Sequence, residues 1–301
     1  MVYPVGLVAA LLLGVGYVLQ QRVAATEPLS DLLKFRLLWD LMHRPLWWAG
    51  IGAMVLGQLL SGLTLQLGAV AVAEPLYSTS LLFALAIAAL LARARPTWRE
   101  MGGAALVSAA LGVFLAVGDP QSGHRHEANT APIVVAIVAV VGAVLVCLTI
   151  GKRQGLIGES IWLAAGAGLL FGLQDVATRA ALVEIDHRGV VAVFVHIWVY
   201  VVLGCAVIGI LLAQSAFEAA RLDCSLPPIT ALEPMVGIAL GIALLGDTVS
   251  AATGALAAEA CCVLAMIVGV ALIVRSPSLS RGGEPPVSPA ALAEPGPGPG
   301  G

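Results

Sequence analysis

Long apolar segments, separated by short stretches that hold the charged residues, account for most of the chain. A helix that spans a bilayer needs about 20 mostly apolar residues. Nine segments meet this requirement, namely residues 3–21, 46–67, 71–92, 100–118, 131–151, 160–180, 190–213, 228–246 and 251–274. The pattern predicts an all-α polytopic membrane protein with nine transmembrane helices.

Residues 28–44 have a different pattern, because charged side chains alternate there with large apolar ones. The charged residues are Asp31, Lys34, Arg36, Asp40 and Arg44, with Leu, Phe and Trp between them. This pattern is typical of an amphipathic helix that lies on the membrane surface. The sequence favours that position and leaves open whether the segment spans.

Composition agrees with this class and excludes others. Hydrophobic residues make up 59 % of the 301 residues and charged residues 11 %, with a mean hydropathy of +0.98. A soluble domain has about 25 % charged residues. A soluble enzyme, a nucleic-acid-binding protein and a disulfide-linked scaffold are therefore excluded as classes. The five cysteines lack CxxC spacing, and His124 and His126 are expected in a solvated loop, so we predict no metal site and no cofactor.

The positions of Lys and Arg predict the orientation. With nine spans, twelve of the fifteen basic residues fall on one side and three on the other. Because basic loops stay in the cytoplasm, we expect the N-terminus outside and the C-terminus in the cytoplasm of a cell-membrane protein. Residues 276–301 are rich in proline and glycine and are expected to form a disordered cytoplasmic tail.

The two halves of the transmembrane region, residues 3–118 and 160–274, resemble each other at a nearly constant offset. The matches are Leu11-Leu12-Leu13-Gly14 with Leu169-Leu170-Phe171-Gly172, Glu74-Pro75 with Glu233-Pro234, and Gly112-Val113 with Gly269-Val270. A single helix, residues 131–151, lies between the halves. The second half would therefore be inverted relative to the first, an arrangement common in secondary transporters.

The chain resembles the drug/metabolite transporter superfamily, in particular EamA-like and NIPA-like actinobacterial membrane proteins. The resemblance covers residues 3–275 and is carried by GVGYVLQQR at 14–22, AVAEPLYSTSLLFALAIAALL at 71–91 and QSAFEAARLDCSLPPITALEPMVGIALGIALLGD at 214–247. Two departures are visible. The family usually has ten spans, and it usually has Gly-Glu where this chain has Gly246-Asp247 and, in the first half, Ala92-Arg93.

Two Glu-Pro pairs are the first candidates for a solute path. Glu74-Pro75 and Glu233-Pro234 occupy corresponding places in the two halves. A carboxylate within the bilayer is costly, so it is retained where it is paired, hydrated or used, and the proline opens the helix backbone beside it. The alternative is that each pair only begins a helix.

Other polar residues within the predicted spans are weaker candidates. Asp175 follows an apolar stretch too short to span and lies four residues before Arg179, the spacing of an ion pair on one helix face. Glu259 interrupts an otherwise uncharged stretch. The uncharged candidates for the path are Tyr17, Gln20, Gln58 and Tyr77, although such residues commonly link helices. Gly168/Gly172 and Gly237/Gly241 have the spacing of close helix contacts.

The resemblance implies a secondary transporter that moves a small solute across the membrane by alternating access. A NIPA-like carrier of Mg²⁺ is one alternative, and a membrane scaffold without transport is another. The expected partners are the lipid bilayer and a small-molecule or ion substrate, with a homodimer left open and no nucleic acid. No catalytic motif is present, so we do not expect an enzyme.

Overall fold

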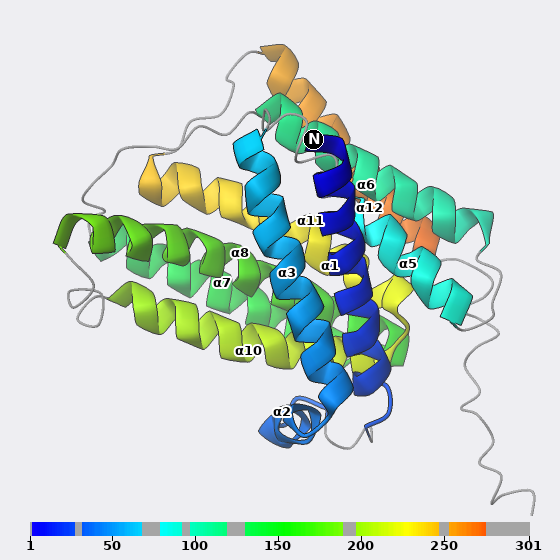
Figure 1. Cartoon of the computed structure of the whole chain (residues 1–301). Coiled ribbons are helices and arrows are strands. Elements are labelled where there is room, and N and C mark those ends of the chain that lie inside the picture. Colours follow the sequence, from blue (N-terminus) through cyan, green and yellow to red (C-terminus); the bar gives the residue numbers. More distant parts are fainter. Residues whose placement is uncertain are drawn as a thin grey trace, which may run out of the picture.

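The described part of the computed structural model, residues 2–27, 32–67, 79–91, 97–118, 130–188, 197–246 and 253–274, consists of helices and short turns (Figure 1). The helices are α1 (Val2–Ala24), α2 (Phe35–Met42), α3 (Pro45–Leu67), α5 (Ser80–Leu91), α6 (Trp98–Gly118), α7 (Thr130–Gly151), α8 (Leu156–Arg188), α10 (Ile197–Ala219), α11 (Leu222–Leu240), the π-helical turn η2 (Gly241–Leu245) and α12 (Thr253–Val274). The predicted all-α class is confirmed for these residues.

Five helical segments are long and apolar enough to cross a membrane. They are Tyr3–Ala24, Pro132–Gly151, Leu156–Ala181, Ile197–Ala219 and Leu222–Leu245. Three shorter apolar helices accompany them, Pro45–Ser61, Ser80–Leu91 and Ala257–Ile273. The protein is therefore a membrane-embedded helical protein, and the count of nine spans stays a prediction.

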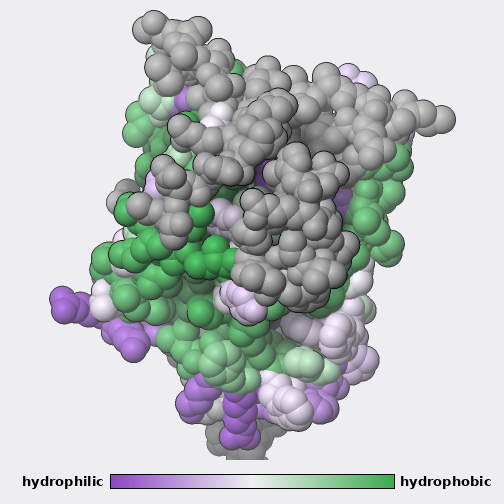
Figure 2. All heavy atoms as spheres, turned by 90° about the vertical axis from the view of Figure 1, so that its left-hand side faces the viewer, coloured by the Kyte–Doolittle hydropathy of each residue, from purple (hydrophilic) through white to green (hydrophobic). Residues whose placement is uncertain are grey.

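The outer surface supports the same conclusion, because large apolar side chains cover it. On α7, Val135 and Val138 are 67 % and 64 % exposed. Figure 2 shows hydrophobic residues over much of one face, with hydrophilic residues gathered along its lower edge. A helix that exposes apolar side chains in this way is stable in lipid rather than in water.

The helices pack in three groups. Helix α1 packs along α3 and also contacts α5, whereas α8 packs against α7, α10 and α11, and α6 packs against α12. In Figure 1, α1 and α3 descend steeply while α7, α8 and α10 run across the view. Helix α1 also touches α10 and α11, and residues of all three groups belong to one core.

The boundary between α10 and α11 differs from the prediction. The sequence analysis placed a loop between residues 213 and 228, but α10 continues to Ala219 and α11 begins at Leu222. The polar residues in this stretch, including Gln214 and Glu218, are buried. They pack between helices instead of ending one. Helix α11 also contains Pro227 and Pro228, which transmembrane helices tolerate more readily than soluble ones.

The amphipathic segment forms the short helix α2. Its Leu37 and Leu41 are fully buried, and α2 contacts both α3 and α10. The backbone N–H of Leu33 donates a hydrogen bond to Ser215 Oγ of α10 at 3.0 Å. An amphipathic helix is confirmed at Phe35–Met42, and its position on the membrane surface stays a prediction.

Candidate functional site

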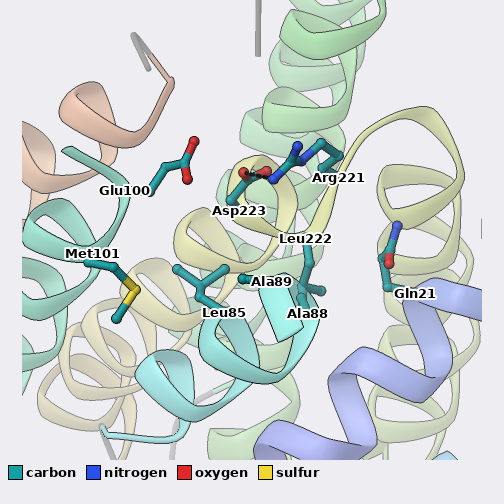
Figure 3. A pocket seen from close by; sticks show the side chains of 9 residues that line it. All are labelled: Gln21, Leu85, Ala88, Ala89, Glu100, Met101, Arg221, Leu222 and Asp223. Atoms are coloured by element: carbon teal, nitrogen blue, oxygen red, sulfur yellow. Dashed lines mark ion pairs between the residues drawn. The ribbon is translucent and has the colours of Figure 1, made fainter. Parts of the chain in front are cut away.

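The ends of four helices meet around a pocket of about 170 Å³. Its walls come from the end of α1, the end of α5, the beginning of α6 and the beginning of α11. The lining residues are Gln21, Leu85, Ala88, Ala89, Glu100, Met101, Arg221, Leu222 and Asp223, and Figure 3 shows their side chains. We take this pocket as the candidate functional site.

Three charged groups define the polar side of the pocket. Glu100 is only 4 % exposed and Asp223 only 6 %, and their charges are close enough to repel each other. Arg221 Nη2 lies 3.1 Å from Asp223 Oδ2. In Figure 3 the guanidinium points toward Asp223, and Glu100 lies on the other side of that carboxylate. Two carboxyl groups and one guanidinium therefore meet on this side of the pocket.

The rest of the wall is apolar or uncharged. Leu85, Ala88 and Leu222 lie together below the charged groups in Figure 3, and Gln21 contributes an amide from α1. Small alanine side chains on α5 leave room at the wall. The pocket therefore combines an acidic side with an apolar floor, which suits a small solute that carries both a cationic and an apolar group.

Local helix chemistry positions Glu100. The N–H of Thr97 donates to Glu100 Oε2 at 3.0 Å, and the N–H of Glu100 donates to Thr97 Oγ1 at 3.4 Å. These reciprocal bonds form a capping box at the beginning of α6. One carboxylate thus both begins the helix and lines the pocket.

Helix α11 has an irregular backbone. Pro227, Pro228 and Pro234 lie inside it, and each lacks the N–H that would bond to the carbonyl four residues earlier. The helix ends in the π-helical turn η2, followed by Gly246 with a left-handed φ of 71°. Openings of this kind in a transmembrane helix are tolerated where other groups satisfy the backbone, and they are common at functional sites.

Two predicted candidates come together farther along α11. A β-carbon built on Gly172 of α8 would lie 2.6 Å from the carbonyl oxygen of Glu233, so α8 and α11 are in close contact there. Asp175 of α8 is near enough to interact electrostatically with both Glu233 and Arg179. Asp175 is exposed and Glu233 is half-buried. The structure therefore places two acids and one arginine in the same region.

Gln20 is part of a buried polar contact between α1 and α10. Gln20 is 5 % exposed and Gln214 only 1 %. Gln214 Nε2 donates to Gln20 Oε1, and Gln20 Nε2 lies 3.4 Å from the sulfur of Met54 on α3. This contact joins three helices, so Gln20 links helices and does not line the pocket.

The other predicted candidates within the described residues lie at separate positions and do not form one site. Tyr17 packs against the main core, and Gln58 is exposed on α3. Glu259 on α12 is half-buried, and its Oε1 has no hydrogen-bond partner in the described structure. Pro234 lies within α11 next to Glu233. The remaining candidates, Glu74, Pro75 and Tyr77, lie outside the described residues.

The sequence analysis missed the charged residues of the pocket. Glu100 and Asp223 lie near the ends of predicted spans, where acids are common and attract no attention. One signal was present, because Thr97 and Glu100 have the spacing of a capping box. The approach of Glu100 to Asp223 has no counterpart in the local sequence. Among the described residues, no group of three or more His, Cys, Asp or Glu side chains is arranged to hold a metal ion.

The described fold and site are those of a helical membrane protein with a small charged pocket where its helices end. The chain is similar to an uncharacterized protein of Corynebacterium glutamicum, with 28 % identity over 279 residues, which cover 92 % of this chain and 95 % of the relative. No protein-family model matches the chain, and no solved structure matches it. The relative's name states no activity.

Proposed function

We propose that this protein is a secondary transporter of the drug/metabolite transporter type, which moves a small organic solute with a cationic group across the cell membrane by alternating access. The observation that carries the proposal is the pocket with two buried carboxyl groups, Glu100 and Asp223, at the junction of α1, α5, α6 and α11. We take this pocket as the cytoplasmic mouth of the solute path. This role needs no catalytic step, so the protein is not proposed to be an enzyme.

The arrangement of the helix ends supports the proposed topology. Nine spans with the N-terminus outside would each have one end on the cytoplasmic side, and four of these are the ends of the first and third spans and the beginnings of the fourth and eighth. The pocket is lined by these four ends. In addition, Arg22 Nη2 donates to the carbonyl oxygen of Leu91 at 3.3 Å. A reporter fused after Arg275 is expected to report a cytoplasmic location, and a tag before Tyr3 an external one.

Two equivalent glycine contacts support the proposed inverted repeat. A β-carbon on Gly172 would meet the carbonyl oxygen of Glu233, Cβ of Val236 and N of Gly237. A β-carbon on Gly14 would meet the carbonyl oxygen of Ser80, Cβ of Phe83 and N of Ala84. In both contacts the three atoms belong to residues i, i+3 and i+4 of the partner helix. Gly14 and Gly172 are also the residues matched by sequence.

Contacts with the next long helix of each half, α3 and α10, show the same correspondence. A β-carbon on Gly57 of α3 would lie 2.8 Å from Cγ of Leu13, and one on Gly209 of α10 would lie 2.7 Å from Cε1 of Phe171. Leu13 and Phe171 are a matched pair in the sequence comparison. The helix pairs α1–α3 and α8–α10 therefore support the same correspondence.

The last helix of each half meets its counterpart in a reciprocal contact. A β-carbon on Gly103 would lie 2.7 Å from the carbonyl oxygen of Gly269, and one on Gly269 would lie 2.8 Å from that of Gly103. Such a contact is expected where a two-fold axis relates α6 to α12. The offsets of these contacts differ, at 158 residues from Gly14 to Gly172, 153 from Ser80 to Glu233 and 166 from Gly103 to Gly269. The contacts therefore support a common packing scheme of the two halves and do not define one register.

A path can follow α11 from the pocket into the membrane. Asp223 and Glu233 are ten residues apart, which is about 15 Å along a helix, half of a hydrocarbon core about 30 Å thick. At the pocket, Arg221 covers Asp223. We infer that a cationic solute replaces this guanidinium at Asp223 and is next met by Glu233 and Asp175.

The ion pair disfavours the alternative of a Mg²⁺ carrier. Mg²⁺ requires a nearly ideal octahedral set of oxygen ligands. In the pocket, Arg221 occupies Oδ2 of Asp223 and Thr97 occupies Oε2 of Glu100. Mg²⁺ can keep several waters and bind through one or two carboxylates, so it is charge that disfavours it. The guanidinium of Arg221 repels a divalent cation about twice as strongly as a monovalent one. A scaffold without transport is the alternative from another class.

Flux measurements in proteoliposomes test the proposal. Purified protein is screened for uptake and efflux of small organic cations, including basic amino acids, and of other amino acids, nucleosides and Mg²⁺. Asp223→Asn should lower the initial rate for an organic cation about tenfold, because a charge-assisted contact worth about 1.5 kcal/mol or more is lost. Asp40→Asn on α2, outside the pocket, is the matched control and should transport at the wild-type rate.

The outcomes separate the three functions. Saturable flux of an organic cation that depends on Asp223 supports the proposal. Flux of Mg²⁺ alone supports the NIPA-like carrier. If no solute crosses although the protein is folded and inserted, the transporter proposal is wrong and the scaffold is favoured.

A further inference from the structure

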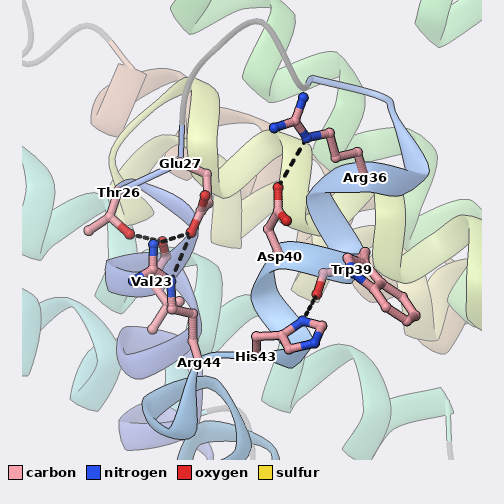
Figure 4. Close-up of polar contacts among 8 residues, drawn as sticks. All are labelled: Val23, Thr26, Glu27, Arg36, Trp39, Asp40, His43 and Arg44. Carbon is pink, nitrogen blue, oxygen red and sulfur yellow. Dashed lines mark hydrogen bonds and ion pairs between the residues drawn. The ribbon is translucent and has the colours of Figure 1, made fainter.

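Helix α2 is held close to the end of a membrane-embedded helix. Only His43 and Arg44 separate α2 from α3, which packs along the candidate span α1. The guanidinium of Arg44 contacts Glu27, just after α1, through Nε at 3.1 Å and Nη2 at 3.0 Å (Figure 4). This contact closes the connection between α1 and α3. With two residues of tether, α2 cannot lie far from the membrane boundary.

The inner face of α2 is already occupied by protein. Leu37 and Leu41 are one helical turn apart, and both are 0 % exposed. They belong to the main core, and the bond from Leu33 to Ser215 fixes the beginning of this segment to α10. The orientation of α2 about its own axis is therefore set by the fold.

The opposite side of α2 carries a second apolar stripe. Phe35, Trp39 and Met42 are 63 %, 64 % and 47 % exposed, and the spacing of four and three residues places them on one side of the helix. Trp48 on α3 is also exposed, and its Nε1 donates to the carbonyl oxygen of Met42 at 2.8 Å. The stripe is therefore continuous with the apolar outer surface of α3.

Two ion pairs account for most of the charged residues around this stripe. Arg36 Nε lies 3.5 Å from Asp40 Oδ2 on the same helix, and Arg44 is paired with Glu27. His43 Nδ1 lies 2.7 Å from the carbonyl oxygen of Trp39 (Figure 4). Beside these two pairs, Lys34 is the further Lys, Arg, Asp or Glu of the described segment 32–44, so the surface offers at most one net positive charge to an anionic headgroup. Its chemistry is that of an aromatic and aliphatic surface at the membrane boundary.

We propose that α2 is an interfacial anchor: its Phe35–Trp39–Met42 stripe inserts between phospholipid headgroups and acyl chains, while its Leu37–Leu41 face holds the end of α10. The occupant of the stripe is the lipid of the membrane in which the protein resides. Insertion depends on apolar contact, so a zwitterionic bilayer is sufficient. A helix of this kind lies about 5–10 Å into the boundary of headgroups and acyl chains.

Site-specific fluorescence in phosphatidylcholine liposomes tests the anchor. In a Cys261→Ser background, which removes the exposed native cysteine among the described ones, Trp39→Cys is labelled with a nitrobenzoxadiazole dye. The matched control is Arg36→Cys on the same helix, since the Arg36 side chain is 71 % exposed. Quenching is measured with aqueous iodide and with phospholipids that carry a doxyl group near the headgroup or deep in the chain.

The dye at position 39 should be quenched most by the shallow doxyl lipid, should be shielded from iodide compared with position 36, and should change little when phosphatidylglycerol is added. Equal iodide quenching at both positions would show that the stripe faces water, where a protein partner could bind, and would overturn the proposal. Strong dependence on phosphatidylglycerol would overturn the apolar mode of insertion. A second labelled variant, Met42→Cys, repeats the test if Trp39→Cys does not fold.

Discussion

The crossing of α1 with α5 and the crossing of α8 with α11 place the same backbone atoms around a glycine, but they differ in the residue that the glycine faces. A β-carbon would lie 2.8 Å from Ala84 N at Gly14, and 2.6 Å from the Glu233 carbonyl oxygen at Gly172. In the first crossing the facing residue is Ser80, which is buried. In the second it is Glu233, which is half-buried and near Asp175.

This difference separates what the backbone does from what the side chains do. Both crossings need a residue without a side chain, because the partner backbone occupies the space that Cβ would take. The chemistry of the contact is then decided by a single facing position. Only one of the two crossings carries a carboxylate there, so the two halves can share a packing scheme and differ in their role in transport.

Substitution of the two glycines should have the largest effect. Gly172→Ala and Gly14→Ala should each destabilise the protein by about 1–3 kcal/mol, because backbone must move to admit the added carbon. The free energy of unfolding in mixed micelles measures this. Gly204→Ala is the control, since no atom lies within 4 Å of the added β-carbon. It should be neutral or stabilising by up to about 1 kcal/mol. A neutral Gly14→Ala would break the equivalence of the crossings.

Substitution of the two facing residues should separate function from packing. Glu233→Gln should lower the initial transport rate per folded molecule about tenfold, which corresponds to roughly 1.4 kcal/mol, because Gln keeps the shape and removes the charge. Ser80→Ala should leave that rate near the wild-type value. A wild-type rate for Glu233→Gln would assign Glu233 to packing, like Ser80.

Glu100, the acid that the first half contributes to the pocket, can be tested through its capping partner Thr97. Thr97→Ala removes the hydroxyl that accepts the N–H of Glu100, and loss of an N-cap costs about 1 kcal/mol. Thermal unfolding measures this cost. Thr149→Ala near the end of α7, where the hydroxyl bonds to the carbonyl of Val146 at 2.9 Å, should cost less. Equal costs would mean that the capping box does not stabilise α6.

The contact that joins the two halves should have the smallest effect. A double-mutant cycle with Gln20→Leu and Gln214→Leu should give a coupling energy of about 0.5–1.5 kcal/mol, as expected for a buried neutral hydrogen bond. Each single variant leaves one amide without its partner. The free-energy costs of the two single variants should therefore add up to more than the cost of the double variant. Additive single costs would show that the two side chains stabilise the protein independently.

Sequence reasoning identified some of the polar residues between helices and missed others, for one physical reason. Gln20, Asp175 and Glu233 were identified because a polar group in an apolar segment is visible locally. The sequence did not show which neighbour each would meet. Glu100 and Asp223 were not identified as candidates, because they lie next to charged segments, where acidic residues are common. Their significance arises from the approach of α6 to α11, which no local pattern predicts.

The sequence by itself determined that this is a helical membrane protein, because the cost of placing about 20 residues in hydrocarbon is a sum over those residues alone. It also determined the amphipathic nature of α2, since that depends on spacing within one short segment. The tertiary structure alone decided the pocket, the Gln20–Gln214 contact and the partner of each glycine. Lipid is as apolar as the side chains that face it, so hydrophobicity does not select which helices pair. Close packing and a few polar contacts make that selection, and both exist only once the helices have met.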